Sequence, residues 1–161
     1  FQANLDATLA DPAGRARVVA AIERQAPHFD LIGLQLGYAY DLDGTPDGDT
    51  AGDGADDGRA YVPSSDPGGR LPHGWVRRAG TACSTLDLVP LDRSVLVAGP
   101  ACDVAADVRV GVDVEDPDGW WSTTLTLPDD GAVLVRPDQH IAARWRSTPT
   151  AAEVAAARGA T

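Results

Sequence analysis

The chain has 161 residues and a formal net charge of −11 at pH 7. This length favours one domain with an extension, and the acidic balance argues against a nucleic-acid partner, because a phosphate backbone is bound by clustered basic residues. No apolar run approaches the roughly 18 residues that a membrane span requires, so none is expected. Met is absent even at position 1, where Phe stands, and we therefore expect a piece of a longer protein.

Residues 1–32 are predicted to be helical. Asp11 is a suitable N-cap, and Pro12 suits the first helical position because its fixed φ matches a helix. Pro27 is expected to end the helix, since it has no N–H to donate. Apolar side chains recur at helical spacing, at Val18, Val19 and Ile22.

The segment that follows, HFDLIGLQLGYAYD (residues 28–41), changes its period. Its first half could form a helical turn. Its second half is predicted to be a strand, because apolar residues alternate there. The alternating residues are Leu34, Leu36, Tyr38 and Tyr40.

Residues 41–58 contain seven Asp and five Gly and almost no apolar group, so a solvated surface loop is predicted. A calcium site is the alternative, because carboxylates are hard oxygen ligands. The spacing does not match the Asp-rich loop of an EF-hand, and no Glu closes it. The stretch GDGADDG is also not a nucleotide loop, because its aspartates would repel phosphate.

The sequence YVPSSDPGGRLPHGWV (residues 61–76) predicts a stiff, extended connection. Each of its three prolines fixes φ near −65° and biases the preceding residue toward extended geometry. The DPGG stretch is predicted to be a tight turn, and a strand is expected over residues 73–76. We call residues 61–72 the proline strap.

Regular elements are predicted from residue 84 onward. The first is a helical turn in STLDLV, capped by Ser84 or Thr85, and it is followed by a buried strand in RSVLVAG and a half-buried strand in ADVRVGVDVE, whose inward residues are Val108, Val110, Val112 and Val114. A short helix carrying Trp120 and Trp121 comes next, and then a hairpin that turns at Pro137 and Asp138 and has its second strand at 140–145. The last element is a helix capped by Thr148 or Thr150 and ending at Gly159.

This order predicts a thioredoxin-like α/β sandwich with a central mixed sheet, preceded by a helical and extended N-terminal segment. The helix expected between the first two strands is poorly marked. We divide the chain into residues 1–60, a helical segment with the acidic loop, and residues 61–161, the thioredoxin-like domain.

No residue pattern in the chain indicates catalysis or metal binding. Cys83 and Cys102 lie nineteen positions apart and form no CxxC, so redox catalysis is not expected. Two buried, reduced thiols are predicted, with a single disulfide as the alternative. His28, His73 and His140 have no companion ligands at helical spacing, and the serine-hydrolase elbow is absent. If the Trp120–Trp121 pair were extended, one ring would face the core and the other an interface.

Three stretches together resemble the C-terminal region of FAD-dependent aromatic hydroxylases: YVPSSDPGGRLPHGWV followed by STLDLV, the later VLVRPDQHIAARW, and the upstream LIGLQLGYAYD. The resemblance is to the phenol and 2,4-dichlorophenol monooxygenase type, with related polyketide hydroxylases. It implies a thioredoxin-like domain without redox cysteines. It also implies that catalysis belongs to a missing N-terminal part, which binds FAD, uses NAD(P)H and hydroxylates a phenolic or polyketide ring through a flavin hydroperoxide.

The two reduced thiols predict a cytoplasmic protein. The resemblance further implies that the C-terminal domain packs on the flavin domain and in some members supports a homodimer. We expect interdomain contacts from Arg70, Pro72, His73, Arg136 and Asp138, because an arginine fork suits bidentate bonds across such a boundary. The alternative is that these residues satisfy only local carbonyl groups. Two other readings are a free-standing thioredoxin-like scaffold and a calcium-responsive module acting through residues 41–58.

Overall fold

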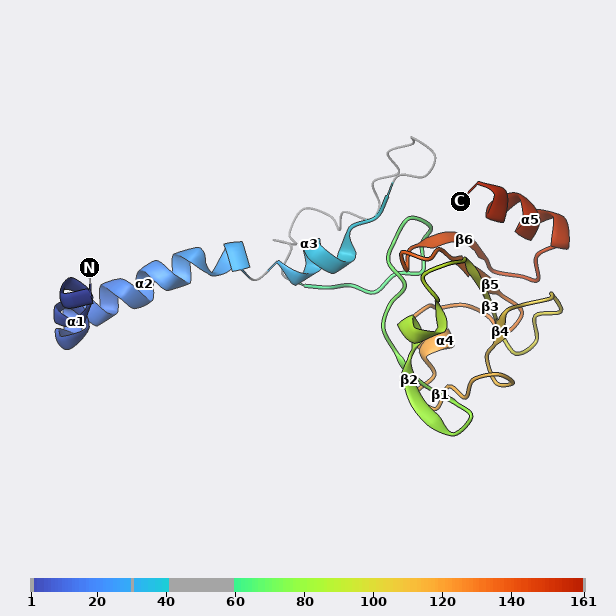
Figure 1. Cartoon of the computed structure of the whole chain (residues 1–161), viewed down its shortest axis with the longest axis horizontal. Helices are drawn as coiled ribbons and strands as arrows, with labels where there is room; N and C mark the ends of the chain where they lie inside the picture. Colours follow the sequence, from blue (N-terminus) through green and yellow to red (C-terminus); the bar gives the residue numbers. More distant parts are fainter. Residues whose placement is uncertain (1, 30, 41–59, 161) are drawn as a thin grey trace.

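A computed structural model describes residues 2–29, 31–40 and 60–160 (Figure 1). An arm of two helices, α1 (Gln2–Ala10) and α2 (Pro12–Phe29), extends away from the body of the molecule. A third helix, α3 (Ile32–Gly37), lies between this arm and the body. The predicted helical N-terminal part is therefore confirmed, whereas the acidic loop and its calcium alternative lie outside the described residues.

Asp11 caps α2 as predicted, since its carboxylate accepts the amide of Gly14 at 2.8 Å. The prediction that Pro27 ends this helix is wrong, because α2 continues to Phe29. Pro27 lies in the last turn, where a missing N–H removes a single intrahelical hydrogen bond close to an end that would fray in any case.

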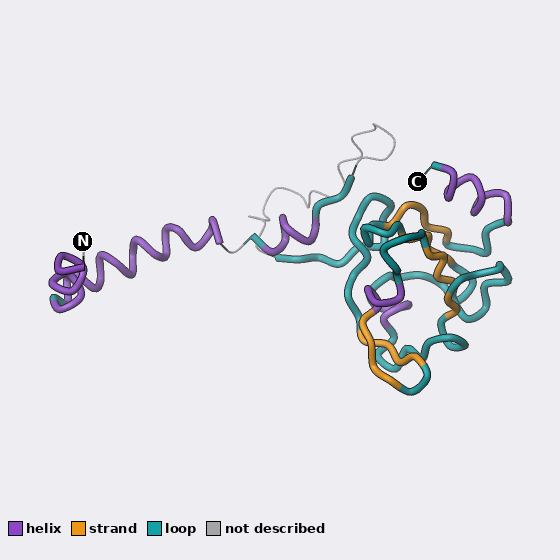
Figure 2. The backbone as a smooth tube through the Cα atoms, in the orientation of Figure 1, coloured by secondary structure: helices purple, strands orange, loops and turns teal. Residues whose placement is uncertain are grey.

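The body contains a mixed four-stranded sheet in the order β4 (Val108–Arg109), β3 (Val95–Ala98), β5 (Ala132–Val135) and β6 (Ile141–Trp145). Figure 2 shows the strands of the body in orange. β3 and β4 are parallel, whereas the β3–β5 and β5–β6 pairs are antiparallel. The predicted mixed α/β architecture with a C-terminal hairpin is therefore confirmed. A separate hairpin joins β1 (Trp75–Arg78) to β2 (Thr81–Ser84).

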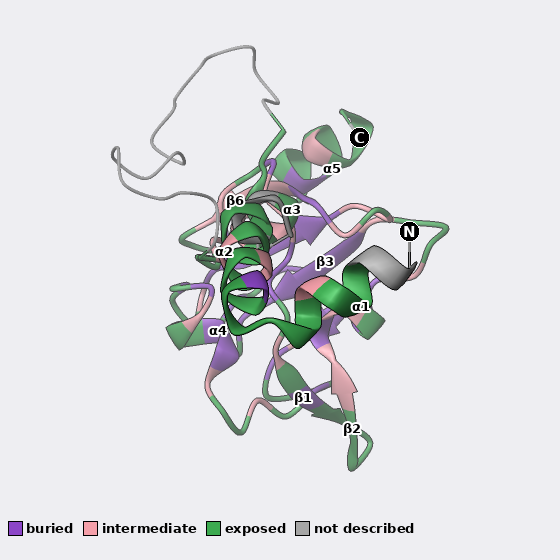
Figure 3. Ribbon diagram, turned by 90° about the vertical axis from the view of Figure 1, so that its left-hand side faces the viewer, coloured by how far each residue is buried: buried purple, intermediate pink, exposed green. Residues whose placement is uncertain are grey.

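The two faces of this sheet are covered by different elements (Figure 3). Val95, Val97 and Val133 pack on one face with the tryptophans of α4 (Trp120–Thr123). Leu96 and Leu134 pack on the other face with residues of α5 (Ala151–Gly159). Every residue of β3 and β5 is buried, as expected for central strands covered on both sides.

The predicted start of η1 and both predicted ends of α5 are confirmed. The hydroxyl of Ser84 accepts the Leu86 amide at 3.1 Å and begins the 3₁₀ helix η1 (Thr85–Leu88). Thr150, the second of the two candidates, caps α5 by accepting the Glu153 amide at 3.2 Å. This helix ends at Gly159, as predicted.

The long strand predicted over residues 106–115 is largely wrong, because β4 contains only two residues. The chain turns at Gly111, where φ is +79°, and the Gly111 amide donates to the Val114 carbonyl at 2.7 Å. Val108 and Val114 are buried as expected, but Val112 lies at the tip of the turn and is 72% exposed.

A second correction concerns the predicted strand over Leu34–Tyr40. Helix α3 occupies residues up to Gly37, and only the following residues are extended. There Ala39 forms an isolated antiparallel bridge with Gly69 of the proline strap. The alternation of apolar residues therefore predicts the extended backbone correctly only for residues 38–40.

The tryptophan pair lies in the predicted short helix, and both rings are buried, at 3% and 2% exposed. Each indole N–H donates to a carbonyl, Trp120 to Pro72 at 3.1 Å and Trp121 to Pro128 at 3.0 Å. The helical turn places both rings inward, so the division between core and interface expected for an extended pair does not occur. Both cysteines are free thiols, with Cys102 buried and Cys83 partly buried.

Candidate functional site

Three segments that are distant in sequence lie side by side next to the sheet: the residues after α3, the proline strap, and the start of β6. The Tyr40 amide donates to the Gly68 carbonyl at 2.9 Å, and the Gly68 amide donates to the Ile141 carbonyl at 2.7 Å. Ile141 in turn donates to the Gly69 carbonyl at 2.8 Å. Gly68 has a φ of +89°, and a Cβ there would lie 2.0 Å from the Tyr40 oxygen, so only glycine fits.

An aromatic cluster lies over this junction. The ring centroids of Tyr38 and Tyr40 are 5.4 Å apart, and those of Tyr40 and His140 are 4.8 Å apart, both with edge-to-face geometry. His140 is only 4% exposed, whereas both tyrosines are exposed. Such rings provide rigid contact area with a polar edge, which is typical of protein interfaces.

Charged and amide groups surround the aromatic cluster. Arg136 pairs with Asp138 at 2.8 Å, and Arg70 donates to the side-chain oxygen of Gln139 at 2.8 Å. Asp138 also accepts the His140 amide at 3.2 Å, which fixes the turn between β5 and β6. We call this set the candidate interdomain surface; it consists of Tyr38, Tyr40, Arg70, Arg136, Asp138, Gln139 and His140.

The pKa values of two tyrosine hydroxyls are raised, that of Tyr40 in the surface and that of Tyr61 nearby. The hydrogen bond with Tyr38 raises the pKa of the Tyr40 hydroxyl, and the Asp138 carboxylate acts in the same direction. Burial raises the pKa of the nearby Tyr61 hydroxyl, while the Arg70 guanidinium opposes that shift. Both phenols therefore stay protonated at neutral pH and can donate hydrogen bonds.

His140 has one unsatisfied atom. Its Nδ1 lies 3.1 Å from the Asp138 carbonyl oxygen, but its Nε2 is buried and has no hydrogen-bond partner. A buried polar atom without a partner costs free energy, so its neighbourhood can gain from a polar group brought by another part of the protein.

The structure brings together three of the five residues expected at the interdomain boundary: Arg70, Arg136 and Asp138. The other two have different neighbours. Pro72 is buried, and its carbonyl accepts the Thr85 hydroxyl at 3.0 Å. The His73 ring lies 2.9 Å from the Ser84 hydroxyl and is exposed.

Sequence reasoning missed the aromatic part of this surface. The signal was the pair Tyr38 and Tyr40, two residues apart in an extended stretch, which places both rings on the same side. Across the described ranges, no His, Cys, Asp and Glu side chains gather in a group of three that could hold a metal ion. None of the helices in the described part of the chain is long and apolar enough to cross a membrane.

Residues 64–160 match the family model described as "Aromatic-ring hydroxylase, C-terminal". The chain is 30% identical to phenol 2-monooxygenase of Pseudomonas sp. (strain EST1001), covering 86% of this chain and 26% of that protein. It is 31% identical to 2,4-dichlorophenol 6-monooxygenase of Delftia acidovorans, covering 82% and 26%. The chain thus spans about a quarter of the length of these relatives.

Two solved structures are also similar. The flavin-dependent monooxygenase PieE, in complex with FAD and substrate, superposes with a TM-score of 0.63 at 34% identity, covering 84% of this chain and 26% of that one. RebC with bound 7-carboxy-K252c superposes with a TM-score of 0.59 at 27% identity, covering 94% and 29%. The family resemblance carried by the strap and the hairpin is confirmed, and this chain belongs to the aromatic-ring hydroxylase C-terminal family.

Proposed function

We propose that the chain is the non-catalytic C-terminal part of an FAD- and NAD(P)H-dependent monooxygenase that hydroxylates a phenolic or polyketide aromatic ring. The observation that carries this proposal is the coverage of the relatives. More than four-fifths of this chain aligns with phenol 2-monooxygenase, yet the match accounts for only 26% of that protein. The remaining length of the relative has no counterpart in this chain and is where we assign the chemistry.

One hollow of the body is too small for FAD. The hollow formed by Arg78, Leu88 and Val95 has a volume of about 150 Å³, whereas sites for larger ligands occupy several hundred. The sequence also has no glycine-rich turn between a strand and a helix, which would hold a pyrophosphate. We therefore assign no residue of this chain to FAD or NAD(P)H.

We further propose that the candidate interdomain surface and the helical arm contact the flavin-binding part. The arm supports this by its exposed apolar side chains, because Val19 is 53% and Ile22 is 64% exposed. Apolar groups on a helix that extends from the body are stabilised when another part of the protein covers them. The exposed tyrosines, the Arg136–Asp138 pair and the unsatisfied His140 Nε2 offer aromatic and polar contacts to the same partner.

Three finer proposals rest on other observations. The body is assigned a thioredoxin-like fold, supported by the parallel β3–β4 pair, the antiparallel hairpin and the C-terminal helix in that order. The two free thiols favour a reducing compartment, and we propose the cytoplasm. A homodimer of the parent is proposed from the family resemblance.

The parent assignment is tested by purifying the protein from its source and measuring its intact mass and visible absorbance. We expect a polypeptide several-fold heavier than 16.7 kDa, with flavin absorption bands and NAD(P)H oxidation stimulated by phenols. A colourless protein of this chain's own mass, with no flavoprotein copurifying, would instead establish the free-standing thioredoxin-like scaffold.

The contact with the flavin-binding part is tested by Ile22→Asp in the parent protein, with Val112→Asp as the matched control. Both residues are exposed and apolar, but Val112 lies at a turn of the body. We expect Ile22→Asp to lower the thermal unfolding temperature of the parent by several degrees, while the control leaves it unchanged. In the isolated chain neither change should matter, so equal effects in both proteins would contradict docking of the arm.

A further inference from the structure

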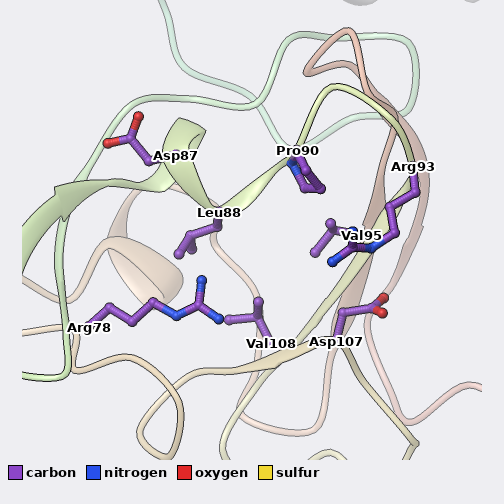
Figure 4. A pocket seen from close by; sticks show the side chains of 8 residues that line it. All are labelled: Arg78, Asp87, Leu88, Pro90, Arg93, Val95, Asp107 and Val108. Carbon is purple, nitrogen blue, oxygen red and sulfur yellow. The ribbon is translucent and has the colours of Figure 1, made fainter.

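A small hollow on the body shares no lining residue with the candidate interdomain surface. Figure 4 shows the side chains that line this hollow. It has a volume of about 150 Å³ and lies where the end of β1, the helix η1 and the parallel β3–β4 pair meet. Its floor is apolar, formed by buried Leu88, Val95 and Val108 with Pro90 at one side. Four charged residues complete the lining: Arg78, Arg93, Asp87 and Asp107.

The two acidic side chains of the hollow already have partners. Asp107 accepts the Leu96 amide at 2.7 Å and pairs with Arg158 at 2.5 Å. Asp87 accepts the Ser84 amide at 2.9 Å as part of the capping box of η1. Both carboxylates are therefore oriented by groups other than the two lining arginines.

The two basic side chains are held only weakly. Within the described residues the Arg78 side chain has no hydrogen bond or ion pair. Arg93 pairs with its neighbour Asp92 at 3.6 Å, and its charge also helps to lower the pKa of Asp107. The Arg93–Asp92 pair is 64% and 77% exposed, and such pairs contribute little free energy. In Figure 4 both guanidinium groups reach over the apolar floor. The two carboxylates balance the two arginines, so the lining is formally neutral. Because Asp107 pairs with Arg158 and Asp87 belongs to the cap of η1, the Arg78 guanidinium remains, within the described residues, to pair with the anionic group of a ligand.

We propose that this hollow binds a small aromatic monocarboxylate, for which benzoate is the simplest probe. A guanidinium fork matches the two oxygens of a carboxylate, and the apolar floor matches a ring. A cavity of roughly this volume holds a benzene-sized molecule. Neither an inorganic anion nor a neutral ring would use both halves of the site. This proposal is independent of the proposed activity of the parent protein.

The test is a titration of the full 161-residue chain with benzoate, followed by NMR of the arginine side chains and of the Leu and Val methyl groups. We expect saturable shifts confined to the lining residues, with a Kd of about 1 mM. Acetate supplies the charge without the ring, and benzyl alcohol supplies the ring without the charge. Each should bind at least about tenfold more weakly, which corresponds to about 1.4 kcal/mol.

Arg78→Gln and Arg93→Gln should each weaken benzoate about tenfold. Arg77→Gln is the matched control, because adjacent residues of a strand face opposite sides and Arg77 does not line the hollow. All three residues are exposed, so the variants should keep the thermal unfolding temperature of the unmodified chain. Phosphate that competes as well as benzoate, shifts spread over the whole chain, or an equal loss in Arg77→Gln would each overturn the proposal.

Discussion

Arg109 and Val104 are joined across the connection between β3 and β4: the guanidinium donates to the Val104 carbonyl at 2.6 Å. The same side chain also donates to the carbonyl groups of Gly99 and Cys102. Residues 99–107 contain no helix, in agreement with the weak helix signal of their sequence. A single half-buried side chain therefore satisfies carbonyl groups that a helix would have bonded internally.

Replacing Arg109 should destabilise the body strongly. We expect Arg109→Ala to lower the free energy of unfolding by about 2–3 kcal/mol, because several charge-assisted hydrogen bonds to carbonyl groups are lost. The free energy of unfolding of Arg109→Lys should lie between those of the unmodified chain and Arg109→Ala, because an ammonium group cannot reach three carbonyl groups as a guanidinium does. Urea denaturation measures both, with Arg77→Ala as the exposed control. A loss in Arg109→Ala no greater than in that control would show that the connection holds without it.

Gly99 should tolerate no side chain. A Cβ at this position would lie 2.3 Å from the Asp129 carbonyl oxygen and 2.8 Å from its carbon, both of which belong to backbone. We expect Gly99→Ala to lower the free energy of unfolding by about 3 kcal/mol, which is at the upper end of the effects of overpacking. Gly159→Ala is the control, because nothing lies within 4 Å of its Cβ and it ends a helix. Thermal unfolding should show a gain for the control and a clear loss for Gly99→Ala.

The stability of the body should depend on the ionisation of Asp107. Burial raises the pKa of this carboxyl, but the hydrogen bond from the Leu96 amide and the interaction with Arg158 lower it by more. The pKa of Asp107 therefore lies below its ordinary value of 3.8. The unfolded state then binds more protons between the two pKa values, and stability falls as pH decreases through that window. Asp107→Asn should be less stable than the unmodified chain at pH 7. The difference should vanish below the folded pKa; a difference that persists there would show that its origin is not charge.

Calcium should leave the chain unchanged. Residues 41–58 have seven Asp but lack the spacing and the closing Glu of an EF-hand loop. We therefore expect no shift of the thermal unfolding temperature on addition of millimolar CaCl₂, with MgCl₂ as the control for ionic strength. A saturable rise specific to calcium would establish the calcium-responsive alternative.

Much of the body could be predicted from the sequence because its signals are local. The run Val95–Ala98, the hairpin ending in β6 and the capping boxes at Ser84 and Thr150 each depend on neighbouring residues. The strand predicted over residues 73–76 overlaps β1, but the sequence does not predict β2 or the hairpin that joins the two. Its turn uses Ala79 with a φ of +50° next to Gly80, and alanine rarely signals a positive φ.

The candidate interdomain surface could be predicted only in part. The strap and the hairpin motif predict contacts from Arg70, Arg136 and Asp138. The proximity of these residues depends on bridges between Ala39 and Gly69 and between Arg70 and His140. Such long-range pairings leave no periodic signal. Val112 shows the opposite failure, because a perfect period-2 pattern was interrupted by a single turn at Gly111.

The position of the proline strap has a consequence for how this body can be cut from a longer polypeptide. The strap occupies the outer edge of β6, where Ile141 exchanges hydrogen bonds with Gly68 and Gly69 and Arg144 pairs with Asp66 at 2.7 Å. The opposite edge strand, β4, is only two residues long. A fragment beginning after Leu71 would leave β6 with unpaired backbone groups, a template for edge-to-edge aggregation. The strap thus covers the edge of the sheet with its own backbone. A fragment that folds on its own therefore has to begin before Ser65.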